Sequence, residues 1–241
     1  EILGHPHLKL EISVNRPRAL LAGRLCDVSP DGSSLLVSWG LFNLCHRNSH
    51  EHPEDMELNQ KTIVEFPLRA TAHRLASGHH WRLSLSTSCF PHAWPSPEKV
   101  ELHLYPGKNT FLYLPVRKEV LENENLTFEP AECSPPLETR FLEKKANRNR
   151  TVLRNASNGK CILRDENHSG RIFFKESGLE IEDSSLDLLQ ISLDDPLSMM
   201  TECKRISAVG RERWQTRVET KSKMTCDEKN FYLENLLEAY E

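Results

Sequence analysis

Apolar and polar residues alternate in short runs along the first half of the chain. Between residues 8 and 14 the apolar side chains occupy every second position, and a period of two predicts a strand with one buried face. Turn residues bound this run and the ones after it, as in an antiparallel sheet. The first run buries Leu8, Leu10, Ile12 and Val14, and later runs lie at 35–39, 62–68, 81–87, 100–104 and 110–116.

The short spacing of these runs favours one fold class. A β-α-β fold needs helical patterns of about ten or more residues between its strands, whereas here turns connect one run to the next. We therefore predict an all-β chain that begins with an antiparallel, jelly-roll-like β-sandwich.

A change of composition divides the chain. Residues 118–136 are rich in Glu, Asn and Pro and end in Ser134-Pro135-Pro136, which can continue neither a ladder nor a helix, so we expect a linker there. Residues 137–241 are expected to form a second antiparallel β unit. Its candidate strands are 151–154, 160–164, 171–174, 188–193, 200–209 and 214–224, while the pattern of 231–240 fits a helix or a strand.

Charge and cysteine usage limit the partners. With 241 residues, a net charge of -4 and 27% charged residues, the chain has no strong field that would attract nucleic acid or an anionic membrane. No apolar run approaches the ~20 residues needed to cross a bilayer. Seven cysteines without a Cys-x-x-Cys pair indicate a reducing compartment, and we predict a cytoplasmic protein.

Four segments occur in an order that resembles a known family. Together they are similar to the C-terminal jelly-roll domain of the cocaine esterase and X-Pro dipeptidyl-peptidase type (CocE/NonD) serine hydrolases. The segments are Arg24–Gly32, with Asp-Val before Ser-Pro-Asp-Gly; Leu41–Arg47, followed by His52-Pro53; Ala76–Leu83, with Gly78-His79; and Leu85–Pro91, with its Phe-Pro end.

The resemblance implies an organisation of the chain. Residues 1–117 correspond to the jelly roll, whose leading strands we expect before Glu1. The second half resembles an extension that some members carry, through residues 194–198 and 220–227. Because that extension ends in strands, we predict a strand for Phe231–Tyr240.

The resemblance also implies a function. Family members combine this jelly roll with a helical cap and an α/β-hydrolase domain that carries a Ser-His-Asp triad. No Gly-x-Ser-x-Gly elbow occurs in these 241 residues. We therefore expect a non-catalytic domain, inactive alone, that stabilises a catalytic domain of the same polypeptide and helps wall its pocket. The alternative is a free-standing carbohydrate- or ligand-binding β-sandwich, which an upstream reading frame with such an elbow would exclude.

Several histidines and cysteines are candidates for metal binding or catalysis. His46, His50 and His52 lie close in sequence beside acidic residues, but we interpret them as part of a solvated loop and predict neither a metal nor a cofactor. His79 is expected to be structural, because no nucleophile accompanies it. Cys26, Cys45 and Cys89 are expected to be core thiols.

The segment of residues 89–97, here called the Phe-Pro loop, is the candidate site. Three prolines stiffen it, and rigid aromatic side chains are typical of interfaces. The resemblance places this loop toward the catalytic domain, although its aromatics could instead plug one end of the sandwich. The predicted interface or pocket-wall residues are Phe90, Pro91, His92 and Trp94, whereas Trp39, Trp81 and Trp214 are expected in the core.

Overall fold

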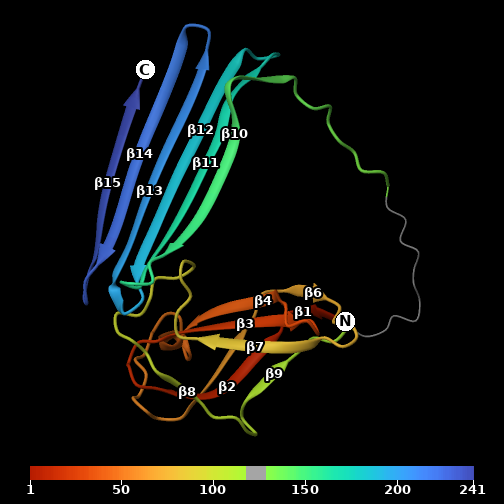
Figure 1. Ribbon diagram of the computed structural model, residues 1–241, viewed down its shortest axis with the longest axis vertical. Coiled ribbons are helices and arrows are strands. Elements are labelled where there is room, and N and C mark those ends of the chain that lie inside the picture. The colour runs from red at the N-terminus through yellow and green to blue at the C-terminus, as the bar shows by residue number, and fades with distance from the viewer. Residues whose placement is uncertain (118–128) are drawn as a thin grey trace. The chain divides into compact units, whose positions relative to one another are not determined.

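The computed structural model describes residues 1–117 and 129–241, without the side chains of 143–145. Part of the expected linker, residues 118–128, lies outside this description. The chain divides into two compact units, Glu1–Leu126 and Thr127–Glu241. Strands dominate both units (Figure 1). No helix among the described residues is long and apolar enough to span a membrane.

The first unit is built from short antiparallel strands. One sheet has the order β5-β2-β8, with β9 also pairing with β2; another has the order β4-β3-β7; and β1 pairs with β6. The elements are β1 (Ile2–Gly4), β2 (His7–Val14), β3 (Leu20–Val28), β4 (Ser34–Asn43), the 3-10 helix η1 (Leu44–His46), β5 (Thr62–Pro67), β6 (Thr71–His73), β7 (His80–Ser86), β8 (Leu102–Leu104) and β9 (Phe111–Tyr113). This arrangement confirms the predicted all-β, sandwich-like fold.

The core of the first unit lies between β2 and β3. All four alternating residues of β2 that the sequence assigned to one face are buried, as predicted. Leu21 and Leu25 of β3 belong to the same buried cluster, together with Val64 and Phe66 of β5. Phe66 also stacks on Phe42 of β4, with 5.2 Å between the ring centroids. Apolar residues from both sheets therefore meet in one core, which is the defining feature of a sandwich.

A tight turn joins β3 to β4 where the sequence predicted one. The Gly32 amide donates to the Ser29 carbonyl at 2.9 Å, and the Ser33 amide donates to the Asp31 carboxylate at 2.9 Å. Gly32 has a φ of 85°, a conformation that a residue without Cβ adopts at little cost.

The second unit is one antiparallel meander, drawn from green to dark blue in Figure 1. Its six strands follow the chain order, and the first five, with 13 to 17 residues, are longer than any strand of the first unit. They are β10 (Thr139–Arg154), β11 (Lys160–Phe174), β12 (Leu179–Ser192), β13 (Asp195–Arg211), β14 (Trp214–Cys226) and β15 (Phe231–Tyr240). The strand predicted at the C-terminal end is confirmed, because β15 pairs with β14 along its whole length.

The predicted strands 160–164 and 171–174 are one strand, β11, so separating them was wrong. The polar residues between them interrupt the apolar pattern, but the ladder continues opposite β12, with Asp165 facing Asp187. Ion pairs replace apolar contacts here: Arg205 donates to both Asp187 oxygens, at 2.8 and 3.0 Å, and Arg148 donates to Asp165 at 3.2 Å. The strand therefore continues through residues that lack the apolar alternation.

Candidate functional site

The Phe-Pro loop is anchored to the first unit at Cys89. The Cys89 thiol is buried and accepts a hydrogen bond from the Arg24 guanidinium at 3.3 Å. Its carbonyl accepts from the amides of His92 and Ala93 at 2.7 and 3.1 Å. The Phe90–Pro91 peptide bond is cis. Backbone contacts thus set the position of the loop after β7.

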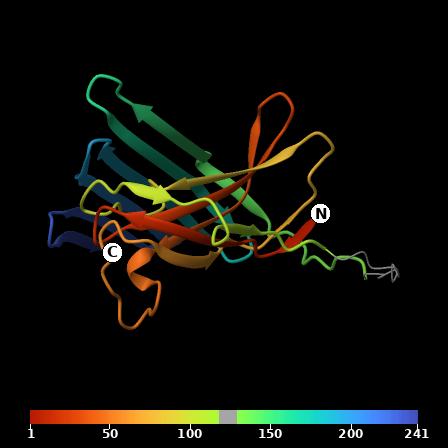
Figure 2. The ribbon, with the colours of Figure 1, turned by 90° about the horizontal axis from the view of Figure 1, so that it is seen from below.

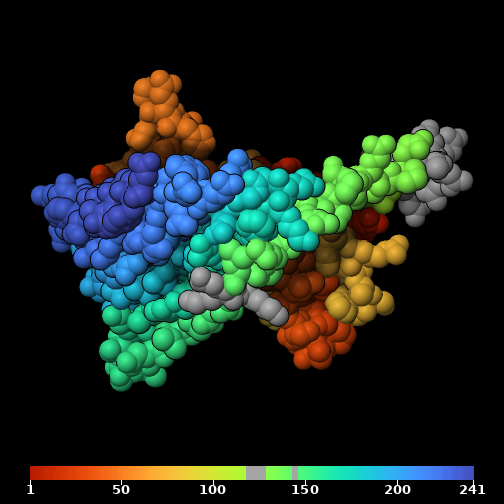
Figure 3. All heavy atoms as spheres, turned by 90° about the horizontal axis from the view of Figure 1, so that it is seen from above, coloured from red at the N-terminus to blue at the C-terminus, as the bar shows by residue number. Residues whose placement is uncertain are grey.

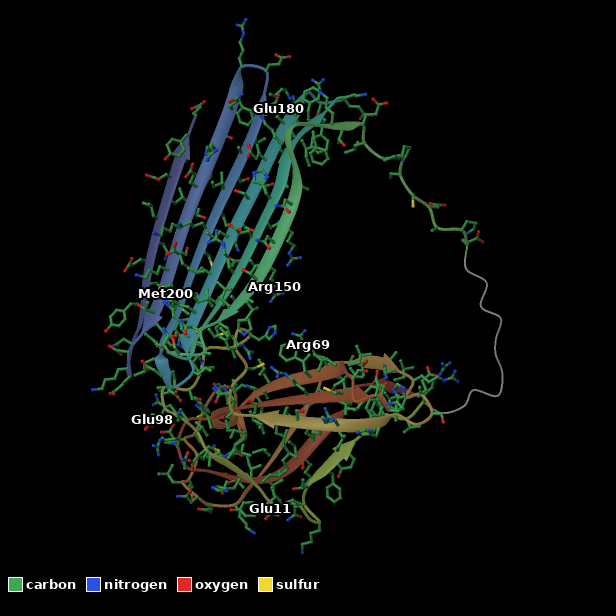
Figure 4. The ribbon with its side chains drawn as sticks, in the orientation of Figure 1. Glu11, Arg69, Glu98, Arg150, Glu180 and Met200 are labelled. Atoms are coloured by element: carbon green, nitrogen blue, oxygen red, sulfur yellow. The ribbon has the colours of Figure 1, made fainter. Side chains whose placement is uncertain are left out.

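The four predicted interface residues differ in exposure. His92 is exposed, whereas Phe90, Pro91 and Trp94 are half-buried. The His92 ring lies 5.0 Å from that of Trp39 in β4. Arg69 covers the same Trp39 ring, with its guanidinium carbon 4.2 Å from the centroid; the residue is labelled in Figure 4. Trp39, Arg69 and His92 are called the Trp39 cluster below.

The structure corrects two expectations about tryptophan. Trp39 is half-buried and lies outside the hydrophobic core, because its strand position places it opposite Arg24, on the outer face of the β4-β3-β7 sheet. Trp214 is 49% exposed at the start of β14, opposite Arg211, so its assignment to the core was also wrong. Trp81 does pack against the core. Arg69 was not singled out because nothing local in the sequence connects it to Trp39.

Trp39 and Arg69 form part of the wall of a hollow of about 380 Å³. It is also lined by His5, Gly40, Leu41, Pro67 and Leu68. Hydrogen bonds hold its walls together: the Arg69 amide donates to the Trp39 carbonyl at 3.0 Å, and His5 Nδ1 lies 3.0 Å from the Leu68 carbonyl. A Cβ on Gly40 would lie only 2.9 Å from the Pro67 carbonyl oxygen, so this close approach requires glycine.

A second polar group lies at the end of β3. The Asp27 carboxylate is almost fully buried and bonds both His73 Nε2, at 2.7 Å, and His79 Nδ1, at 2.8 Å. His73 also contacts the edge of Trp81, 5.6 Å between ring centroids. The hydrogen bond with His73 is the main cause that holds the pKa of Asp27 below its ordinary value. The sequence singled out His79 as structural but gave no sign that β6 would supply its neighbour.

We expect the Asp27→Asn substitution to weaken the acid dependence of stability. A lowered carboxyl pKa contributes stability that is complete above the ordinary Asp pKa and is lost as pH falls through the folded-state value. The melting temperature of the wild-type chain should therefore fall more steeply than that of the variant between about pH 5 and pH 2. Glu57→Gln, at an exposed carboxylate of the same unit, is the control; equal acid slopes for Asp27→Asn and the wild type would contradict the expectation.

The remaining histidine and cysteine candidates do not form a site. The loop after η1, orange in Figure 2, projects from its unit. His46 and His50 lie 5.3 Å apart, whereas the His52 side chain is 82% exposed. In residues 1–117 and 129–241, no cluster of three or more His, Cys, Asp or Glu side chains could hold a metal ion. All seven cysteines lie in these ranges; Cys45 and Cys89 are buried and Cys26 is half-buried.

Residues 1–128 match the family described as the X-Pro dipeptidyl-peptidase C-terminal non-catalytic domain. The chain belongs to this family. The X-Pro dipeptidyl-peptidase C-terminal domain thus accounts for the whole described part of the first unit, including the Phe-Pro loop, the Trp39 cluster and Asp27. The match ends before β10, so the meander lies outside it.

Two solved structures resemble this family member. One is an alpha-amino acid ester hydrolase labelled with selenomethionine, with a TM-score of 0.46 and 24% identity, over 48% of this chain and 23% of that one. The other is an aminopeptidase from the marine sediment archaeon Thaumarchaeota archaeon, with a TM-score of 0.37 and 21% identity, over 37% of this chain and 16% of that one. The chain thus spans less than a quarter of either protein. A comparison with curated proteins found no match.

Proposed function

We propose that this X-Pro dipeptidyl-peptidase C-terminal domain stabilises an α/β-hydrolase-type serine acyl or peptidyl hydrolase domain of the same polypeptide and helps to wall its substrate pocket. The observation that carries the proposal is the way the Phe-Pro loop is held. Its buried Cys89 accepts a hydrogen bond from Arg24, and its His92 ring contacts the Trp39 ring. A loop held in this way is already ordered before a partner binds.

Interface energetics support this role. Phe and Trp offer a large apolar area with few rotatable bonds, and Trp and Arg are enriched among the residues that contribute most to binding. Phe90 and Trp94 are only half-buried in the chain, so each retains area to bury against another domain. Burying that area contributes on the order of 2 kcal/mol for each side chain.

The alternative of a free-standing carbohydrate-binding module has less support. Such modules commonly stack sugar rings on an open aromatic face. The Trp39 ring already has the Arg69 guanidinium 4.2 Å from its centroid, so a sugar would have to displace this cation. The proposed role at a domain interface leaves the contact between Trp39 and Arg69 in place.

The test uses the double substitution Phe90→Ala/Trp94→Ala in both the isolated chain and the full-length hydrolase. In the full-length protein we expect ester or X-Pro peptide turnover to fall about tenfold or more, because on the order of 2 kcal/mol per side chain is lost at the interface. The melting temperature of the isolated chain should fall less than that of the full-length protein, because no partner domain covers the two side chains there. Steady-state kinetics and thermal melting provide the two readouts.

A matched control is available on the same unit. Leu35→Ala/Leu36→Ala truncates two apolar side chains at exposed positions of β4 and should leave both readouts unchanged. If the isolated chain is strongly destabilised while the full-length protein keeps its turnover, the two aromatics only plug the sandwich and the proposal fails.

The isolated chain is expected to hydrolyse neither p-nitrophenyl acetate nor an X-Pro p-nitroanilide, because its sequence holds no Gly-x-Ser-x-Gly elbow. Turnover that co-purifies with the chain and is abolished by a serine-directed inhibitor would contradict this expectation.

A further inference from the structure

The two edges of the meander differ in how they are protected. The edge strand β10 carries Arg140, Arg148, Arg150 and Arg154, and charged side chains on an edge strand oppose pairing with another chain. The other edge strand, β15, contains no Lys, Arg or Pro along Phe231–Tyr240, and its two charged side chains are Glu234 and Glu238. Its residues are all exposed, and in Figure 3 its atoms, in the darkest blue, lie uncovered at the end of the row of strands. Among the described strands, β15 pairs only with β14.

We propose that β15 is a dimerisation edge that pairs antiparallel with β15 of a second copy of this chain, with Asn235 on the two-fold axis. The inference is independent of the proposed function, because the family match ends before the meander. A two-fold axis perpendicular to the sheet places the same face of both copies on the same side. Each residue of β15 therefore lies opposite a residue of the partner whose side chain points to that same side.

On one face this register builds an apolar pair on each side of a central amide pair. Leu233 would face Leu237 of the partner subunit, and Asn235 would face its own copy. Leu233 and Leu237 are 63% and 67% exposed in the single chain, so the pairing removes apolar surface from water. The two Asn235 amides can donate to and accept from each other.

On the opposite face the same register keeps the acidic side chains apart. Glu234 would face Leu236, and Tyr232 would face Glu238, each contact occurring twice by symmetry. Glu234 already lies opposite Lys223 of β14 within its own sheet. No carboxylate therefore lies directly opposite another across the new ladder.

Moving the axis toward the C-terminal end of β15, by one residue or by two, gives a worse match. With Leu236 on the axis, Glu234 would face Glu238 twice, and like charges directly opposite each other destabilise a ladder. Moving the axis to Leu237 would avoid this repulsion but would shorten the paired segment and leave Leu233 facing Glu241. The distribution of charge along β15 thus selects the register centred on Asn235.

Cysteine cross-linking tests the register directly. Four variants of the chain of residues 1–241 are made, Glu234→Cys, Asn235→Cys, Leu236→Cys and Leu237→Cys. Each is oxidised beside the wild-type chain, which gives the baseline for the seven native cysteines. The Cα atoms of residues directly opposite each other are about 4.5–5.5 Å apart, which is within disulfide reach. With the axis at Asn235, the two copies of residue 237 are four residues apart along the ladder, about 13 Å. We expect Asn235→Cys to give a covalent dimer at a rate at least about tenfold above Leu237→Cys.

Sedimentation equilibrium provides the second test, with a matched pair of variants. Leu233→Lys alters β15 and Leu153→Lys alters β10 at residues that are 63% and 61% exposed. We expect Leu233→Lys to raise the Kd of the dimer at least about tenfold, because by symmetry the substitution alters two contacts between the strands. Leu153→Lys should leave the Kd unchanged.

Three results would overturn the proposal. The first is a wild-type chain that stays monomeric at all concentrations. The second is an equal effect of Leu233→Lys and Leu153→Lys on the Kd. The third is cross-linking that is equal at all four positions, which indicates parallel in-register stacking, or strongest at Glu234→Cys, Leu236→Cys or Leu237→Cys, which indicates another axis.

Discussion

Replacing Leu10 with Ala is expected to destabilise the first unit by about 2–5 kcal/mol. Leu10 is 1% exposed in β2, faces Val64 of β5 and belongs to the cluster that joins the two sheets. The substitution removes the transfer free energy of the lost methyl and methylene groups and leaves a cavity that the surrounding strands fill only in part. Urea titration monitored by circular dichroism gives the change in the free energy of unfolding.

Leu35→Ala is the matched control for this experiment. Leu35 is 61% exposed in β4, so the same chemical change there should alter the free energy of unfolding by no more than about 0.5 kcal/mol. Comparable losses for the two variants would show that β2 does not supply the buried face of the sandwich.

Replacing Gly40 with Ala is expected to destabilise the first unit by about 1–3 kcal/mol and to separate Arg69 from Trp39. The added Cβ would lie 2.9 Å from the Pro67 carbonyl oxygen, a backbone atom that moves only with its segment. Because the Arg69 amide bonds the Trp39 carbonyl, displacement of this segment should disrupt the Trp39 cluster. The indole resonance of Trp39, assigned with Trp39→Phe, reports that change.

Gly23→Ala is the comparison variant. Its Cβ would lie 2.7 Å from a terminal methyl group of Leu8 in the buried core and does not approach the Pro67 carbonyl. We therefore expect a loss of stability of the same order as for Gly40→Ala, about 1–3 kcal/mol, but an unchanged Trp39 resonance. Equal changes of the Trp39 resonance in the two variants would show that contact with the Pro67 carbonyl does not position Arg69.

The long strands of the meander show where the sequence pattern was insufficient. Periodicity identified the apolar ends of β11 but divided the strand, because Asp165 and its polar neighbours interrupt the alternation. The strand continues because backbone hydrogen bonding in a ladder does not depend on apolar side chains, and because ion pairs such as Arg205 with Asp187 stabilise polar positions.

The sequence by itself determined the all-β class, the buried face of β2, the turn before Ser34 and the absence of a nucleophile elbow. Each of these is a local property, set by the period of side-chain burial, by turn chemistry or by a contiguous motif. The Phe-Pro loop was also identified locally, from its prolines and aromatics.

Only the tertiary structure decided which distant residues meet. Asp27 bonds His73 and His79, and Trp39 contacts Arg69 and His92, because strand order and register bring these positions together. The same dependence explains why Trp39 and Trp214 were wrongly assigned to the core. An alternating pattern fixes which residues share a face, but whether another layer covers that face depends on the packing of the sheets.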